Sequence, residues 1–146
     1  MRRSRGPEEN ALGRSRGGVS TKIHAITDTD GKPLHIEITP GQRHDVVMAE
    51  CLLEHVQGQA CIADAGYDSN KFIEAITTKG LTPVIMSNPS RKEPLPLDRT
   101  LYNLRYRVEC FFHSLKRFRR VATRYEKTAR NYLAFLHIAC ALVWVT

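Results

Sequence analysis

The sequence lacks the short motifs that mark several large classes of enzyme and metal-binding protein. No GxSxG nucleophile elbow, no phosphate-binding P-loop and no CxxC pair occurs in its 146 residues. These absences argue against a serine hydrolase, a P-loop nucleotidase and a zinc ribbon. The most apolar stretch, at 132–145, is shorter than the about 20 residues that cross a membrane. We therefore expect a buried helix there and no membrane partner.

The cysteines are few and scattered, at Cys51, Cys61, Cys110 and Cys140. Each sits among apolar residues, which is typical of buried free thiols in a reducing compartment. We expect a cytoplasmic protein without disulfides.

Positive charge is in excess, with 22 Lys and Arg against 15 Asp and Glu and a net charge of +7. Such a balance favours a polyanionic partner, most often nucleic acid. Five arginines and four glycines fall within 1–20, where few residues are able to form a core. We expect residues 1–20 to be a flexible basic arm and residues 21–146 to be the folded domain.

Two alternating, β-forming segments, at 21–27 and 33–39, flank the turn residues Asp30-Gly31. This pattern predicts a hairpin, with His24 and His35 on its faces. The elements expected after it are a helix at 46–56 with Asp45 at its N-cap, a strand at 60–63, a helix at 70–78 capped by Asp68 or Ser69, a strand at 81–86 and a loop at 87–98. The fold class is therefore α/β, a mixed sheet with packed helices. Because a hairpin alone is marginally stable, we expect further strands beside it.

Residues 102–116 have the pattern of an amphipathic helix with a polar line along one edge. At about 100° per residue, the side chains of this line fall within an arc of roughly 60°. Its members are Tyr102, Arg105, Glu109 and Lys116. Glu109 is the only acid among them, and its simpler interpretation is an ion pair with Arg105 four residues earlier.

Asp64 is the second acid of interest, because it directly follows the apolar run at 60–63. Open α/β sheets place their sites at such strand ends. The alternative is a turn or helix cap, which is also the better explanation of Asp68. Carboxylates on separate elements, without a His or Cys cluster, suit Mg²⁺ or Mn²⁺, which support phosphoryl transfer. That chemistry normally uses three or four acids, and the residues alone indicate two, Asp64 and Glu109.

The densest basic stretch follows Lys116 directly. It contains Arg117, Arg119, Arg120, Arg124, Lys127 and Arg130, with Phe118 and Tyr125 between them. A solvated helix face is the usual meaning of such a run. Its continuity with the polar line at 102–116 favours contact with phosphates instead.

The spacing Tyr102-x2-Arg105-x3-Glu109-x6-Lys116 resembles the Y-R-E-K signature of insertion-sequence DDE transposases. Other blocks in the same order are similar to the insertion-sequence-five superfamily of these enzymes: Gly13-Arg-Ser-Arg-Gly-Gly18 with Thr21-Lys-Ile-His24, Thr39-Pro-Gly-Gln-Arg-His-Asp45, Cys61-Ile-Ala-Asp64-Ala-Gly-Tyr67-Asp68-Ser69, and Arg119-Arg120-Val-Ala-Thr-Arg124-Tyr-Glu-Lys127. The resemblance extends from about Gly13 to the C-terminus.

The resemblance implies an RNase H-like fold and Mg²⁺- or Mn²⁺-dependent DNA strand cleavage and strand transfer. It also implies binding to transposon ends and target DNA, in the nucleoid. Carried over by position, Asp64 is the second catalytic acid and Glu109 the third, and both are metal ligands. DNA contacts are expected at Tyr102, Arg105, Lys116, Arg119, Arg120 and Arg124.

One departure from the family concerns its first catalytic Asp, which lies on a strand upstream of the block at 13–18. No residue here matches it, since Asp28 and Asp30 fall in the hairpin turn. We expect an N-terminally truncated, partial catalytic domain that is inactive alone. It is then the C-terminal part of a transposase, completed by an N-terminal product or a homo-oligomer. The alternatives are an inactive fragment that binds DNA or full-length transposase and modulates transposition, and an RNase H-like domain with no surviving role.

Overall fold

The structure is a computed structural model that describes residues 10–16 and 18–146. Residues 1–9 and 17 of the expected basic arm lie outside the described residues. The rest of that segment is ordered, because β1 (Gly13–Ser15) pairs antiparallel with the start of β2 (Gly18–Thr27). Arg124 also donates hydrogen bonds to the carbonyl oxygens of Asn10 and Ala11. The prediction of a flexible arm is therefore wrong for the residues that the two strands include.

The predicted hairpin is confirmed. β2 pairs antiparallel with β3 (Pro33–Pro40). In the turn, Asp28 Oδ1 accepts hydrogen bonds from the backbone N–H groups of Asp30 (2.9 Å) and Lys32 (2.8 Å). Gly31 has φ 79°, a conformation that favours glycine. The Asp-Gly pattern therefore sets the register of the hairpin.

A separate two-stranded parallel sheet consists of β4 (Ala60–Ala63) and β5 (Thr82–Ile85). Helix α2 (Asn70–Thr78) connects them and packs against α1 (Val46–Leu53). Both strands and the bounds of α2 agree with the predictions. Helix α1 ends three residues earlier than expected, because the chain leaves it in tight three-residue turns toward Gly58 at φ 118°.

The predicted helix caps are confirmed in part, because the two carboxylates considered as caps have distant partners. Ser69 caps α2, since its Oγ accepts from the backbone N–H of Phe72 at 3.1 Å. Asp68 binds Arg91 instead. Asp45 occupies the N-cap position of α1 but makes no side-chain cap bond there, and its Oδ1 lies 3.0 Å from Lys22 Nζ.

The C-terminal third is helical but interrupted. The expected helix at 102–116 is built from α3 (Arg99–Tyr102), the 3₁₀ segment η3 (Asn103–Arg105) and α4 (Tyr106–Leu115). Helices α5 (Arg119–Ala122) and α6 (Ala129–Val145) follow. The expected helix at 132–145 is confirmed within α6, but only one of its sides is buried. Within the described residues, no helix is both long and apolar enough to span a membrane.

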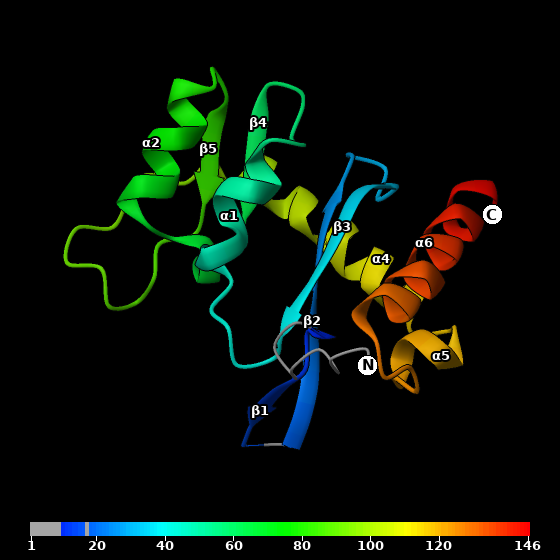
Figure 1. The fold of residues 1–146 in the computed structure, drawn as a ribbon. Helices are drawn as coiled ribbons and strands as arrows, with labels where there is room; N and C mark the ends of the chain where they lie inside the picture. Colours follow the sequence, from blue (N-terminus) through cyan, green and yellow to red (C-terminus); the bar gives the residue numbers. More distant parts are fainter. Residues whose placement is uncertain (1–9, 17) are drawn as a thin grey trace.

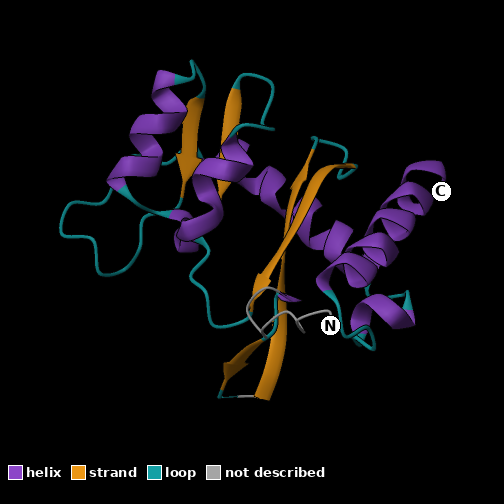
Figure 2. Ribbon diagram, in the orientation of Figure 1, coloured by secondary structure: helices purple, strands orange, loops and turns teal. Residues whose placement is uncertain are grey.

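The side chains form two separate hydrophobic cores. The first core joins β3, α4, α5 and α6 through Ile36, Phe111, Leu115, Val121, Tyr132, Leu136 and Ala139. The second core joins α1, β4, α2 and β5 through Ala49, Leu53, Cys61, Phe72, Ile76, Leu81 and Ile85. The β2–β3 hairpin lies between the two groups of helices (Figure 1), and α4 passes behind it toward α6 (Figure 2). Each core, with the elements packed on it, forms one half of the molecule, and the candidate acids lie where these two halves meet.

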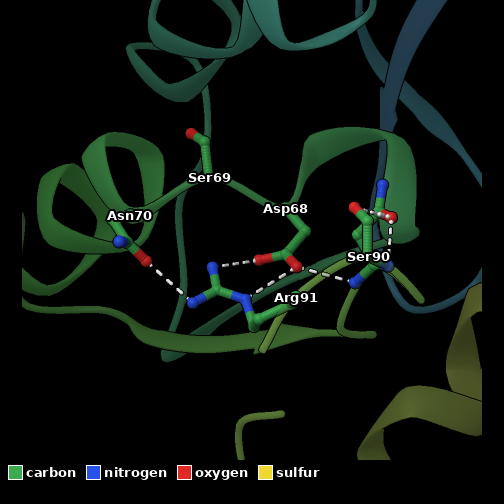
Figure 3. A pocket seen from close by; sticks show the side chains of 6 residues that line it. Asp68, Ser69, Asn70, Ser90 and Arg91 are labelled. Atoms are coloured by element: carbon green, nitrogen blue, oxygen red, sulfur yellow. Dashed lines mark hydrogen bonds and ion pairs between the residues drawn. The ribbon is translucent and has the colours of Figure 1, made fainter. Parts of the chain in front are cut away.

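An ion pair fastens the 87–98 loop to the start of α2 (Figure 3). Arg91 Nη2 lies 2.6 Å from Asp68 Oδ1, and Arg91 Nε donates to Asp68 Oδ2 at 2.9 Å. The backbone N–H of Asn88 also donates to Asp68 Oδ2, and Arg91 Nη1 donates to Asn70 Oδ1. Arg91 holds the pKa of the Asp68 carboxyl below its usual range. The residues that line the hollow drawn in Figure 3 are therefore joined to one another in a structural clamp.

All four cysteines are free, as expected, but their burial differs. Cys61 is buried, and burial raises the pKa values of the Cys61 and Cys140 thiols to about 11. Cys51 and Cys110 are exposed. The expectation of four buried thiols is wrong for these two, which lie on the outer faces of α1 and α4.

Shortening a side chain in the first core tests that core. Leu136 is fully buried, and Leu136→Ala is expected to lower the free energy of unfolding by about 2–5 kcal/mol. The matched control is Leu142→Ala on the same helix, where 42% of the residue is exposed. That change is expected to cost less than about 1 kcal/mol. Urea unfolding measures both, and equal losses would contradict the assignment of Leu136 to the core.

The clamp is tested by Asp68→Asn, which keeps the shape of the side chain and removes its charge. We expect trypsin to cut at Lys92 roughly tenfold faster or more, because hydrogen bonds to charged groups are the stronger ones. Glu50→Gln is the matched control, since Glu50 pairs with Lys71 on the exposed surface. Unchanged cleavage of the Asp68→Asn loop would contradict the role of the clamp.

Candidate functional site

Asp64 lies directly after β4 and begins the turn η2 (Ala65–Tyr67). Its Oδ1 accepts a hydrogen bond from the backbone N–H of Gly66 at 3.0 Å. The cap interpretation of Asp64 is therefore confirmed. The cap engages one carboxylate oxygen and leaves a half-buried side chain at the end of the strand, so it is compatible with a second role.

A second carboxylate, which the sequence interpretation had assigned only to a helix cap, lies beside Asp64. A methyl group placed on Gly66 would lie 3.1 Å from Asp64 Oδ1 and 3.0 Å from Asp45 Oδ2. The backbone at Gly66 thus fits closely between the two carboxylates, and a side chain there would require both carboxylates to shift by a few tenths of an ångström. A local pattern does not identify this neighbour, because Asp45 and Asp64 come from different elements.

Two side chains of β2 reach toward this turn. Lys22 and His24 are two residues apart and therefore project from the same face of the strand. Lys22 Nζ contacts Asp45 Oδ1, and it also donates to the carbonyl oxygen of Arg43 at 2.8 Å. His24 Nδ1 lies 3.2 Å from the Tyr67 hydroxyl, and Nε2 lies 2.8 Å from Thr39 Oγ1. His24, which was expected on a face of the sheet, is thus a buried residue that links β2, β3 and η2.

The groups of this link are neutral at physiological pH. Burial lowers the pKa of His24, against the opposing effect of Asp45. Burial also raises the pKa of Tyr67, with smaller contributions from Asp45 and Asp64. Hydroxyl groups both donate and accept, so either tautomer of a neutral imidazole is satisfied between them.

Glu109 lies in the first turn of α4 with the other members of the polar line. Arg105 Nη2 lies 2.5 Å from Glu109 Oε1, which confirms the ion-pair interpretation. The Arg105 guanidinium lies 5.7 Å from the centre of the Tyr102 ring. This contact follows from η3, because residues three apart eclipse one another in a 3₁₀ helix. The Glu109 side chain is 58% exposed, and Lys116 is exposed about two helical turns further on.

The segments that directly precede the two predicted acids pack together, because η3, which leads into α4, contacts β4, which ends at Asp64. No hydrogen bond or ion pair joins Asp64 to Glu109 within the described residues. The described part of the chain also contains no cluster of three His, Cys, Asp or Glu side chains arranged to hold a metal ion. The structure therefore offers hard oxygen donors in one region without a complete ligand set.

The basic side chains after α4 differ in their exposure and in their hydrogen-bond partners. Lys116, Arg119 and Arg120 are exposed. Arg120 also lies 3.5 Å from Glu126 and over the ring of Phe135. Arg124 is different, because all five of its N–H donors bind acceptors within the chain. These acceptors are the carbonyl oxygens of Asn10, Ala11, Glu126 and Lys127 and the hydroxyl of Thr21.

The comparisons with known proteins identify a family. The family described as the transposase DDE domain matches residues 5–144. A protein of Brucella ovis, described as "Putative transposase for insertion sequence element IS6501", is 42% identical over 130 residues, 87% of this chain and 99% of that protein. A Burkholderia cepacia protein, described in the same words for IS402, is 30% identical over 150 residues, 94% of this chain and 68% of that protein. No solved structure matches the chain. The family match and both relatives show that the chain belongs to the DDE-domain transposases of insertion sequences.

Proposed function

We propose that the chain is the catalytic part of a transposase that cleaves DNA at the ends of an insertion sequence and joins those ends to target DNA. The observation that carries the proposal is the polar line Tyr102, Arg105, Glu109 and Lys116 on one helical segment beside β4. Cations on both sides of an acid suit a phosphate backbone, because they neutralise the charge of the phosphates. The chain would then act on DNA in the nucleoid.

Asp64 and Glu109 are the proposed ligands of a divalent cation. Their carboxylates are the hard oxygen donors that Mg²⁺ and Mn²⁺ prefer, and no thiol or imidazole cluster competes among the described residues. When bound, such an ion activates a water or a 3′-hydroxyl and stabilises the leaving oxygen. Arg105 pairs with Glu109 and holds that side chain on the face of the helical segment that carries the polar line.

The proposed DNA surface consists of cations that follow one another from η3 to α5, of which Arg105 is half-buried and Lys116, Arg119 and Arg120 are exposed. Arg105 and Lys116 flank Glu109, and Arg119 and Arg120 continue the surface. Tyr102 borders it through its contact with Arg105. We leave Arg124 out of the proposed contacts, because its guanidinium is committed to the first residues of the described chain.

An RNase H-like fold completed by an added strand is the architecture that fits these proposals. Along 21–27, the edge of β2 away from β3 has no strand partner among the described residues, and neither does the edge of β4 away from β5. The segment from α3 to α4 contacts β4 through α3 and β2 through α4, so both strands border the same helical segment. We propose that another polypeptide segment pairs there and supplies a further acid. It comes from an N-terminal transposase product or from a second copy of the chain.

A second candidate function is favoured by the incomplete ligand set. A chain with a basic surface, but with two candidate acids that do not contact each other, would still bind DNA or full-length transposase. It would then modulate transposition without cleaving DNA.

Strand cleavage of a duplex carrying the element's ends distinguishes these functions. We expect the chain alone to leave the DNA intact, because one metal-bridging acid is missing from its site. Together with an N-terminal transposase product, we expect cleavage that requires Mg²⁺ or Mn²⁺ and is lost in Asp64→Asn and Glu109→Gln. Gel electrophoresis of labelled DNA measures the products.

The matched control is Asp30→Asn in the exposed hairpin turn, which is expected to cleave normally. Cleavage that survives both Asp64→Asn and Glu109→Gln would contradict the site. Cleavage by the chain alone, abolished by Asp64→Asn, would instead refute the need for an added acid. Absence of cleavage with every partner, while DNA is still bound, would favour the modulating function.

The DNA surface is tested by the salt dependence of binding. Lys116→Gln, Arg119→Gln and Arg120→Gln are each expected to reduce the slope of log K against log salt concentration by about 1, because each removes one released counterion. Lys71→Gln on α2 is the control, with an unchanged slope expected. Fluorescence anisotropy over a range of salt concentrations measures the slopes, and a salt-independent affinity would contradict the proposed surface.

A further inference from the structure

We propose that Tyr67 and His24 are positioning residues for Asp64, which hold the turn at 64–68 against β2 so that its carboxylate keeps a fixed place at the DNA-cleavage site. This inference rests on the proposed function of Asp64.

Hydrogen bonds within the turn at 64–68 set its shape, but they do not fix its position in the molecule. The Asp64 carbonyl oxygen accepts from the N–H of Tyr67 at 3.1 Å, and that of Ala65 accepts from Asp68 at 3.2 Å. With the Gly66 bond to Asp64 Oδ1, these contacts set the shape of the turn. They do not set its position relative to the β2–β3 hairpin, which belongs to the other half of the molecule.

Tyr67 connects the two halves. Its ring packs against Phe72 of the second core, with 6.2 Å between ring centres. Its hydroxyl lies 3.2 Å from His24 Nδ1 on β2. A rigid aromatic side chain anchored at both ends therefore fixes the distance between the turn and the strand.

His24 is a firm anchor for this contact. Only 2% of the residue is exposed, and its other ring nitrogen lies 2.8 Å from Thr39 Oγ1 on β3. Rotation of the imidazole would break one or both contacts in a place that water does not reach. Because unsatisfied buried polar groups are costly, the ring is held in one orientation.

A parallel contact limits movement on the other side of the turn. Lys22, on the same face of β2, holds Asp45. The Asp45 carboxylate lies against the backbone at Gly66. A sideways shift of the turn would therefore press Gly66 into Asp45 or pull Tyr67 away from His24.

Amide hydrogen exchange in the full-length chain tests the positioning role without requiring catalysis. Tyr67→Phe removes the hydroxyl and keeps the ring that packs on Phe72. We expect the Gly66 amide to exchange about tenfold faster in this variant, because the turn opens locally more often. The Phe72 amide, bound to the Ser69 cap, is expected to change less than about twofold. Nuclear magnetic resonance resolves both amides.

Tyr125→Phe is the matched control, since Tyr125 is an exposed tyrosine, and both amides are expected to stay unchanged in it. His24→Gln is the second variant and is expected to reproduce the effect of Tyr67→Phe. Unchanged exchange at Gly66 in both variants would overturn the proposal. Equal acceleration at Gly66 and Phe72 would also overturn it, because that result indicates general loss of stability.

A second readout separates this inference from the proposed function. In the completed transposase, Tyr67→Phe is expected to lower the cleavage rate about tenfold or more while the Kd for DNA stays within twofold, since a displaced acid slows the reaction without removing DNA contacts. If the unsubstituted protein does not cleave DNA, the proposed function fails and the exchange data still decide whether Tyr67 and His24 position the turn. Normal cleavage by Tyr67→Phe would overturn the positioning role alone.

Discussion

The hydrogen bond between His24 and Tyr67 crosses the boundary between two hydrophobic cores, and much of the structure's geometry depends on contacts of this kind. Apolar packing is non-directional, so two separate cores do not by themselves fix how their halves are placed. Hydrogen bonds are directional, and leaving a buried polar group unsatisfied costs about 1–3 kcal/mol. The contact of buried His24 with Tyr67 therefore penalises a shift of one half against the other, and the partly exposed Lys22–Asp45 pair adds a smaller contribution.

The helical segment from α3 to α4 makes a second connection, and it carries the other candidate acid. α3 contacts β4 and β5, whereas α4 contacts β2 and packs on α6. Glu109 is thus placed by an element that touches both halves. The tightened turn of η3 brings Tyr102 next to Arg105, which in turn binds Glu109. Asp64 and Glu109 are each located by contacts across the same boundary, although they do not contact one another.

Local patterns predicted the parts of the fold that depend on neighbours in sequence. The hairpin and the Arg105–Glu109 pair depend on residues that are close in sequence. Helix α2 and the strands β4 and β5 are indicated by the order of apolar and polar residues within each element. The residues that sequence reasoning misassigned have distant partners: Asp45 binds Lys22, Asp68 binds Arg91, and Arg124 binds Thr21 and the backbone near Asn10. A polar residue at a helix start fits a cap equally well, so the pattern does not reveal a partner elsewhere. The interruption of the helix at η3 was not predicted, because no glycine or proline occurs there.

The two cores and the free edges of β2 and β4 have a common explanation. A strand that pairs with both edges would join the two sheets through backbone hydrogen bonds, and its side chains would pack against the helical segment that already spans them. The two halves would then be placed by a continuous sheet as well as by a few polar contacts. On this view, the segment that supplies the missing acid also fixes the distance between Asp64 and Glu109. If the proposed function holds, catalytic competence and structural completion would be the same event, and without that segment the chain would keep the proposed DNA-binding surface but hold its acids apart.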